Sequence, residues 1–327
     1  MGLRGGIDLG GTKIQAVVID DAGDVRGEAR LPTPVTGGPQ GVTDAVGDAV
    51  GEAADAAGIP AGELDAVGVG SPGVIDVAAN SVTSARNLPD WESTFPLGAV
   101  LSERVGVPVR LGNDVDVATM AEFELGAGRD YDSLLGVFWG TGVGGGIVLN
   151  GQLWSGRGAA AEIGHMVVQQ HGGAQCPCGR YGCMEAYAGR GALEAIARRR
   201  AGNGEPTALF EIMEERGRTR LTSGVWNRAL KQDDKLATEL IGIAIEALGT
   251  AIGSAVNLID PEAVIIGGGL GLKLGEPYVE RIVEAMMPHV FADERPPAVH
   301  LASLGDLGGA IGAALLARDA VTSGPRA

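Results

Sequence analysis

A tight turn that carries Gly-Thr lies between two apolar runs in each half of this 327-residue chain. The first turn contains Gly11-Thr12 and the second contains Gly140-Thr141. Apolar runs separated by turn residues around each of them predict a meander of three short strands. A later apolar run in each half is followed by a glycine-containing turn, at residues 66–73 and 263–269. We therefore infer an internal duplication of an α/β unit.

Hydrophobic patterning places strands and helices around these turns. The predicted strands span residues 5–9, 14–19, 25–31, 66–70, 107–111, 134–139, 147–149, 152–155 and 263–266. The predicted helices span residues 42–57, 96–105, 233–257 and 307–318, with a further helix that starts near Asp114, its expected N-cap. Two α/β halves with glycine-rich turns that face each other imply a cleft between them. We expect a small domain of residues 1–115, with residues 305–327 packed back on it, and a large domain of residues 116–304.

The charge balance argues against nucleic acid as a partner. The net charge is −16, and the short basic run 198–200 is more typical of a solvated helix face. An acidic protein can still bind ATP, because Mg²⁺ accompanies the triphosphate and backbone N–H groups hold it. No basic segment followed by an apolar stretch opens the chain, and no apolar run reaches the ~20 residues that span a bilayer. We expect a cytoplasmic protein without a membrane partner.

The first turn is suited to phosphate, although a plain glycine hairpin explains it about as well. Its glycines let the backbone approach a ligand, Thr12 offers a hydroxyl and an N–H group, and Asp8 could reach Mg²⁺. The equivalent turn in the second half strengthens the phosphate interpretation, because two turns can hold one triphosphate from both sides. A late glycine-rich turn would admit adenine and ribose. The residues expected at the nucleotide are Asp8, Gly10, Gly11, Thr12, Lys13, Gly140, Thr141, Gly142, Gly267, Gly268 and Gly269.

Three cysteines within one short window form a poor disulfide framework and a good metal site. Cys176, Cys178 and Cys183 follow His165 at a spacing typical of a closed Cys₃His set for structural Zn²⁺. His171 is a competing fourth ligand. Three thiols without a metal are the alternative interpretation.

Asn113 and Asp114 lie at the end of the predicted strand 107–111, where parallel α/β sheets place their chemistry. A hydroxyl that attacks a phosphorus atom needs a proton acceptor, and a carboxylate suits that role. The neighbouring amide can both donate and accept hydrogen bonds. An N-cap aspartate is the competing explanation for Asp114.

Five segments together resemble the ROK family of sugar kinases and repressors, in the family's order and over residues 5 to about 317. These segments are Asp8–Lys13, Gly140–Gly146, Glu162–His165, Cys176–Glu185 and Gly267–Gly269. The resemblance implies the duplicated actin/hexokinase/Hsp70-like fold with its interdomain cleft. It implies that Asp114 is the catalytic base. The positions that match the family's sugar contacts are Asn87, Asn113, Glu162, His165 and Glu185.

The resemblance also favours His165 over His171 as the zinc ligand, because His165 ends the family's Glu-x-Gly-His motif. Zinc would then fix the segments that carry Glu162 and Glu185. The sequence departs from the family at three points: Gly112 stands where many members have Glu, Asp116 where Asn is frequent, and Trp139 where an aliphatic residue is usual. These departures bear on sugar or nucleotide preference.

The implied activity is an ATP-dependent hexose kinase, with glucose favoured on family frequency. Mannose, fructose, allose, N-acetylmannosamine and N-acetylglucosamine are alternative acceptors, and polyphosphate is an alternative donor. A repressor of the same family would carry a DNA-binding domain before the first turn, whereas Asp8 is only seven residues from Met1. A non-catalytic sugar sensor is the other alternative. We expect a homo-oligomer, a dimer or a tetramer.

Overall fold

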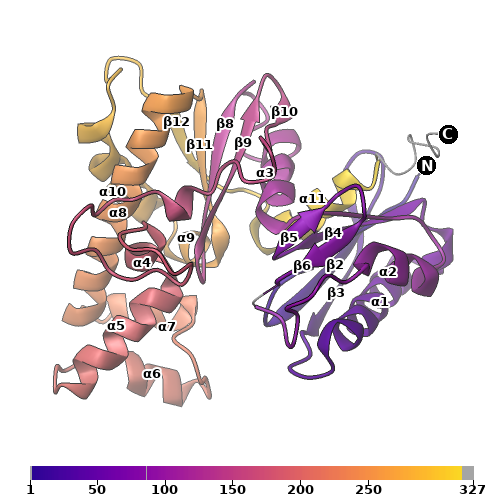
Figure 1. Cartoon of the computed structure of the whole chain (residues 1–327), viewed down its shortest axis with the longest axis horizontal. Helices are drawn as coiled ribbons and strands as arrows, with labels where there is room; N and C mark the ends of the chain where they lie inside the picture. The colour runs from indigo at the N-terminus through magenta and orange to yellow at the C-terminus, as the bar shows by residue number, and fades with distance from the viewer. Residues whose placement is uncertain (1, 86, 319–327) are drawn as a thin grey trace. The chain divides into compact units, whose positions relative to one another are not determined.

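The computed structural model describes residues 2–85 and 87–318, and the chain divides into two compact units (Figure 1). Unit 1 comprises residues 1–129 and 303–327, and unit 2 comprises residues 130–302. Residues 319–327 of the predicted C-terminal segment lie outside the described residues. Each unit has its own sheet and its own hydrophobic core.

The sheet of unit 1 has the strand order β3-β2-β1-β4-β7. Its strands are β1 (Arg4–Leu9), β2 (Lys13–Ile19), β3 (Val25–Pro32), β4 (Ala66–Ser71) and β7 (Val109–Asn113). The first three form the antiparallel meander, and β4 and β7 are added in parallel to β1. The unit also contains the hairpin β5 (Val74–Asp76) and β6 (Ser81–Thr83) and the helices α1 (Gly38–Ala56), η1 (Ala61–Glu63), α2 (Leu97–Val105), α3 (Asp114–Glu124), η4 (Gly305–Leu307) and α11 (Gly308–Leu316).

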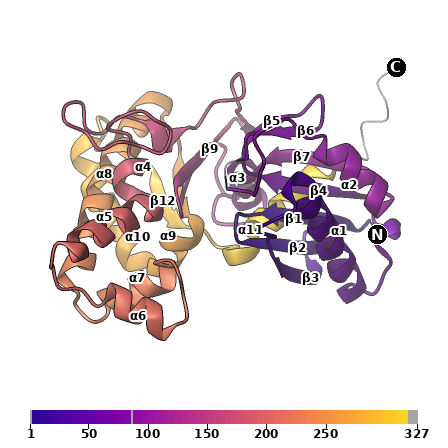
Figure 2. The same ribbon diagram turned by 60° about the horizontal axis from the view of Figure 1, so that its bottom comes forward.

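Helices cover both faces of this sheet, and glycines in the strands allow the closest approach (Figure 2). A Cβ at Gly27 would lie 2.3 Å from the carbonyl oxygen of Ala53 in α1. On the other face, a Cβ at Gly6 or Gly68 would lie 2.0 or 1.7 Å from carbonyl oxygens of α11. Helix α11 therefore packs directly onto β1 and β4, the strands that lead to the predicted site.

The sheet of unit 2 has the order β10-β9-β8-β11-β12, which repeats the arrangement of unit 1 strand for strand. Its strands are β8 (Leu134–Trp139), β9 (Val143–Leu149), β10 (Gln152–Leu153), β11 (Ala263–Gly267) and β12 (Ala298–Leu301). The helices are η2 (Ile163–His165), α4 (Glu185–Ala188), α5 (Arg190–Gly202), α6 (Leu209–Glu215), α7 (Ser223–Leu230), α8 (Lys235–Ile259), α9 (Gly268–Leu274), α10 (Glu276–Met286) and η3 (Met287–His289). The predicted duplication is confirmed.

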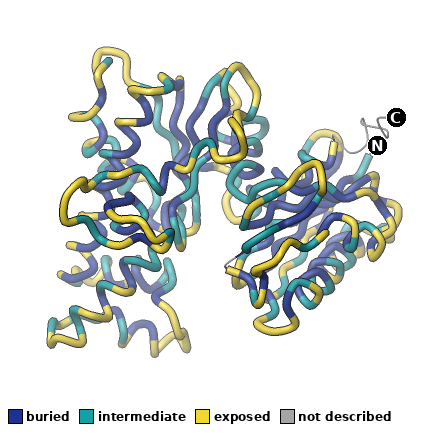
Figure 3. Tube along the Cα trace, viewed as in Figure 1, coloured by how far each residue is buried: buried dark blue, intermediate teal, exposed yellow. Residues whose placement is uncertain are grey.

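Helix α8 is long and apolar enough to span a membrane by length and composition, so the expectation that no apolar run reaches that length is wrong. However, 67% of its most apolar window is buried inside the protein. The buried residues along one side of α8 form much of the core of unit 2, where the tube is dark blue (Figure 3). Core helices of soluble proteins pass the same test, so this helix is weak evidence for a membrane.

Several expected boundaries need correction. The compact units divide after Arg129 rather than at residue 115, because α3 packs extensively against α11 within unit 1. The N-cap of α3 is Asn113, so the expected N-cap role of Asp114 is wrong. Residues 143–146 belong to strand β9, which shortens the second turn, and residues 267–269 form a junction between β11 and α9 rather than a turn.

Candidate active site

The first phosphate turn connects β1 to β2 in unit 1 and is held by its own backbone. The N–H of Gly10 donates to the carbonyl oxygen of Lys13 at 3.0 Å, and the hydroxyl of Thr33 donates to the carbonyl oxygen of Gly10 at 2.6 Å. A Cβ at Gly11 would lie 2.6 Å from the carbonyl oxygen of Asn87. Glycine at position 11 therefore lets the predicted sugar residue Asn87 lie directly against the phosphate turn.

Asp114 stands at the start of α3, two strands away from Asp8 in the sheet. Asp8 on β1 is paired with Gly70 on β4, and a Cβ at Gly70 would lie 3.4 Å from the Cα atom of Asp114. Burial and, after it, the negative charge of Asp8 raise the pKa of Asp114 to about 6, while the N–H of Val115 opposes the shift. A carboxylate with a pKa near 6 is ionised at neutral pH and basic enough to accept a proton.

Burial also raises the pKa of Asp8, which the charge of Lys13 lowers and that of Asp306 raises. The first turn of α11 lies against this carboxylate, since a Cβ at Gly309 would be 3.0 Å from the Cγ atom of Asp8. Carboxylates that destabilise one another in this way are stabilised by a cation, and oxygen is the ligand that Mg²⁺ prefers. The residues around Asp8 therefore fit a magnesium ion.

Asn113 uses one side of its amide to cap α3. Its Oδ1 accepts from the N–H groups of Val115 at 2.9 Å and Asp116 at 3.2 Å. The cap fixes the side chain and leaves its NH₂ group as a donor for a sugar hydroxyl. The charge of Asp116 contributes the smallest of the effects that raise the pKa of Asp114.

The second phosphate turn, between β8 and β9 in unit 2, is closed by the N–H of Gly140, which donates to the carbonyl oxygen of Gly142 at 2.9 Å. The late glycines lie beside it, because β8 and β11 are parallel neighbours. A Cβ at Gly268 would lie 2.6 Å from backbone atoms of Trp139, and one at Gly140 would lie 3.9 Å from the nitrogen of Gly269. Unit 2 thus brings together the residues predicted for phosphate and for adenosine.

Trp139 is fully buried, and its Nε1 donates to the carbonyl oxygen of Ala188 at 2.7 Å. This hydrogen bond ties the end of β8 to the end of α4. The unusual tryptophan therefore supports the second turn from within the core of unit 2.

Four side chains gather in the arrangement that a tetrahedral metal requires. The ligand atoms of His165, Cys176, Cys178 and Cys183 all lie within 4.8 Å of one another. The Sγ of Cys176 is 3.7 Å from Nδ1 of His165, and the sulfurs of Cys178 and Cys183 are 3.8 Å apart. A tetrahedral zinc ion separates two sulfurs by about 3.8 Å and a sulfur from a nitrogen by about 3.6 Å. These side chains therefore fit structural zinc, and His171 is not a member of the cluster.

Glu185 links this cluster to the second phosphate turn. Its Oε2 accepts from the N–H of Val143 at 2.9 Å, and its Oε1 lies 3.8 Å from the sulfur of Cys176. A Cβ at Gly142 would lie 2.2 Å from Oε2, so a larger residue there would displace the carboxylate of Glu185. On the other side of the cluster, Nε2 of His165 lies 3.8 Å from Oε2 of Glu162. Glu162, His165 and Glu185 therefore surround the predicted metal in unit 2, whereas Asn87, Asn113 and Asp114 belong to unit 1.

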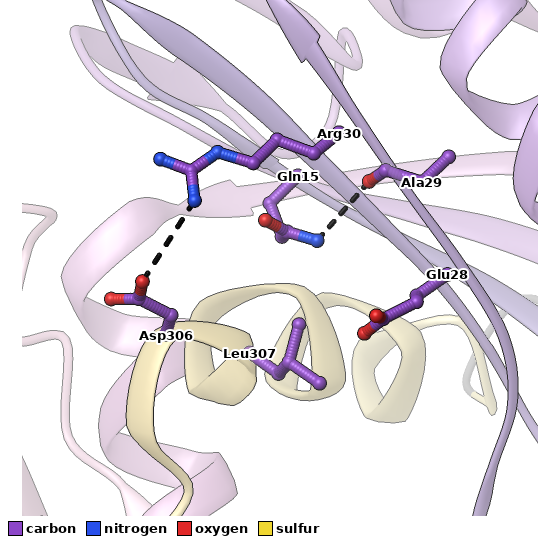
Figure 4. A pocket seen from close by; sticks show the side chains of 6 residues that line it. All are labelled: Gln15, Glu28, Ala29, Arg30, Asp306 and Leu307. Carbon is purple, nitrogen blue, oxygen red and sulfur yellow. Dashed lines mark hydrogen bonds and ion pairs between the residues drawn. The ribbon is translucent and has the colours of Figure 1, made fainter.

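A cavity of about 390 Å³ lies elsewhere in unit 1, between β2, β3 and the η4–α11 segment (Figure 4). Its lining residues are Gln15, Glu28, Ala29, Arg30, Asp306 and Leu307. Gln15 donates to the carbonyl oxygen of Ala29 at 3.1 Å, and Arg30 lies 4.0 Å from Asp306. None of the predicted site residues lines this cavity.

Arg190, which the sequence analysis did not identify, lies on the second phosphate turn. Its guanidinium donates from NH2 to the hydroxyl of Thr141 at 2.7 Å. The only sequence signal is its position between Gly189 and Gly191, shortly after Glu185. Such a signal does not distinguish a site residue from a solvated helix start.

The comparisons with known proteins agree with this geometry. The sequence matches the model of the family described as ROK family over residues 4–320. It is 34% identical to a glucokinase of Streptomyces coelicolor over 98% of both chains, and 32% identical to an N-acetylmannosamine kinase of Haemophilus influenzae over 98% of this chain and 96% of that one. The structure is similar to that of a ROK family glucokinase from Streptomyces griseus in complex with glucose and AMPPNP, with a TM-score of 0.83 and 35% identity over 97% of this chain and all of that one.

Proposed function

Because the chain belongs to the ROK family, we propose that it is an ATP-dependent sugar kinase that phosphorylates the 6-hydroxyl of glucose. Glucokinases at 34% identity over nearly the whole chain support this activity, and so does a structural neighbour that holds glucose and AMPPNP. The observation that carries the proposal is Asp114, a carboxylate with a raised pKa beside Asp8 and the first phosphate turn.

The reaction needs one proton transfer and one phosphoryl transfer. The carboxylate of Asp114 accepts the proton of the sugar hydroxyl as its oxygen bonds to the γ-phosphorus of ATP, the bond to the β-phosphate oxygen breaks, and ADP leaves. A positioned base typically contributes ~10²- to 10⁴-fold to such a step. Mg²⁺, held by Asp8, would supply charge neutralisation for the triphosphate.

The remaining groups bind and orient. The turns at residues 10–13 and 140–142 bind the phosphates, and residues 267–269 accept the adenosine. Asn87 and Asn113 in unit 1, and Glu162, His165 and Glu185 in unit 2, bind the sugar hydroxyls. Zn²⁺ on His165 and the three cysteines is structural. His165 can serve both roles because Nδ1 faces the cysteines and Nε2 faces Glu162.

A coupled assay tests the proposal with a panel of sugars and two donors, ATP and polyphosphate. We expect turnover with ATP and the highest kcat/KM for glucose. Asp114→Asn keeps the side-chain volume and the acceptor for Val115, and we expect it to lower kcat by about 10²-fold or more. A wild-type enzyme that phosphorylates no sugar would overturn the function, and an Asn variant with wild-type turnover would overturn the base.

N-acetylmannosamine is the second candidate acceptor, because the kinases for that sugar match this chain at 32% identity over 98% of its length. The same panel decides between the two sugars. A cytoplasmic location, a homo-oligomeric state and the lack of a nucleic-acid partner remain predictions from the sequence. Light scattering in solution would test the oligomeric state.

A further inference from the structure

Arg190 begins helix α5 with its backbone and its side chain both on the second phosphate turn. The N–H of Arg190 donates to the carbonyl oxygen of Gly140 at 3.1 Å, and the N–H of Gly191 donates to that of Thr141 at 2.9 Å. The guanidinium donates from NH2 to the Thr141 hydroxyl at 2.7 Å and from NH1 to the carbonyl oxygen of Leu221 at 2.9 Å. These four bonds fix the guanidinium relative to the turn.

The positive charge of Arg190 has no paired anion within the part of the chain that the structure describes. No carboxylate there lies within ion-pair distance of it, and its Nε is buried without a hydrogen-bond partner. The nearby Glu194 is already bound by Arg198, Arg220 and the N–H of Leu221. Burial lowers the pKa of Arg190, the charge of Glu194 opposes this shift and the charge of Arg220 adds to it, so the charged form is destabilised overall where it lies. An arriving anion would remove that cost.

The bond to Thr141 has a chemical consequence. A hydroxyl that accepts from a guanidinium must direct its own hydrogen elsewhere, and the donated bond polarises it into a stronger donor. Thr141 is exposed, so its hydrogen is available to a ligand. The arrangement thus presents an oriented O–H donor, backed by a cation, from a turn of the Gly-Thr type.

We propose that Arg190 is a positioning residue for the nucleotide, which orients the Thr141 hydroxyl toward a phosphate oxygen of MgATP through its charge-assisted hydrogen bond. This inference rests on the proposed kinase function. It assigns a nucleotide role to a residue of α5, in addition to the turns themselves.

The test compares Arg190→Gln, Arg190→Lys, Thr141→Val and the Arg190→Gln/Thr141→Val double variant. Steady-state kinetics give KM for MgATP and for glucose, and calorimetric titration with MgADP gives the nucleotide Kd. The matched control is Arg295→Gln in the same unit, whose exposed guanidinium is paired with Asp260 at 2.9 Å.

We expect Arg190→Gln to raise KM for MgATP and Kd for MgADP about tenfold, the usual loss for a hydrogen bond from a charged group. KM for glucose should change less than twofold. Arg190→Lys should recover part of the loss, because it keeps the charge without the guanidinium geometry. The double variant should be no more than about twice as impaired as either single variant, because Arg190 acts through Thr141. The control should match wild type.

Unchanged nucleotide affinity in Arg190→Gln would overturn the inference. Losses that multiply in the double variant would also overturn it. Equal increases in KM for MgATP and for glucose, together with a lowered melting temperature, would indicate that Arg190 has a structural role only. If the wild type phosphorylates no sugar, the proposed function fails, while the MgADP titrations still decide the role of Arg190.

Discussion

At the scale of single residues, the base of the proposed reaction is tuned by its carboxylate neighbours. Asp114 has a pKa raised to about 6, first by burial and then by the charge of Asp8, with a smaller contribution from Asp116. Such a group is mostly ionised at pH 7 and becomes protonated as the pH falls below 6. Proton acceptance by Asp114 therefore fails on the acid side of neutrality.

We predict that kcat/KM for glucose falls about tenfold per pH unit below a pKa near 6. Asp116→Asn removes one of the charges that raise the pKa of Asp114, so its acid limb should move to lower pH. The measurement is a pH–rate profile of the wild type and of Asp116→Asn between about pH 4.5 and 8, a range that lies on both sides of a pKa near 6. A profile that stays flat down to about pH 4.5, or an acid limb that Asp116→Asn moves upward, would contradict this account of the base.

At the scale of secondary-structure elements, one buried carboxylate joins the segments where the chain leaves and re-enters unit 1. Glu122 in α3 is 2% exposed. It accepts from the N–H of Ala127 at 2.9 Å, from the N–H and hydroxyl of Ser303 at 3.0 and 3.3 Å, and from the N–H of Leu304 at 2.9 Å. This carboxylate therefore ties α3 to the segment from which η4 and α11 begin, directly after Leu304.

We predict that Glu122→Gln lowers the free energy of unfolding by about 2–3 kcal/mol, because an NH₂ group replaces an oxygen that faces N–H donors. Chemical denaturation followed by circular dichroism measures the change. Glu124→Gln is the matched control on the same helix, where a partly exposed glutamate pairs with Arg318, and should cost no more than about 1 kcal/mol. Equal effects of the two substitutions would show that the buried network is not what holds these segments.

Hydrophobic patterning predicted some of the strands and helices and missed others. Runs such as 5–9 and 134–139 were predictable because buried strands are continuous apolar segments between glycine turns. The helices α4 and α6 and the strand β12 were missed because each has at most seven residues, too few for a clear periodicity. Whether Asn113 or Asp114 caps α3 depends on backbone angles, which residue type alone does not settle.

At the scale of the whole molecule, the duplication was readable because each copy repeats the same order of strands and turns. The cluster of His165 with the three cysteines was predictable from the spacing of the cysteines together with the family resemblance, which favoured His165 over His171. Arg190 and the contact of Glu185 with Val143 were not predictable, because they join segments more than forty residues apart. Sequence patterns identify local motifs, whereas these contacts depend on how the motifs pack.

Metal removal tests how far the influence of the metal cluster extends. Glu185 lies 3.8 Å from the sulfur of Cys176 and accepts from the N–H of Val143, so its position depends on the cluster and in turn supports the second phosphate turn. Unit 1 has a separate core and sheet. Loss of zinc should therefore loosen unit 2 from the cysteines to the turn at residues 140–143 and leave the sheet of unit 1 intact.

We predict that one equivalent of zinc copurifies with the chain, and that its removal by a chelator raises KM for both glucose and MgATP. Amide hydrogen exchange followed by mass spectrometry should show faster exchange in residues 162–188 and at Val143, with unchanged protection in β1 and β4. Glu185→Gln with zinc bound should reproduce the change at Val143 alone, because it weakens the acceptor and leaves the metal ligands in place. Faster exchange throughout both units would mean that zinc stabilises the whole chain rather than orienting one side of the site, and absence of zinc would remove the metal from the mechanism.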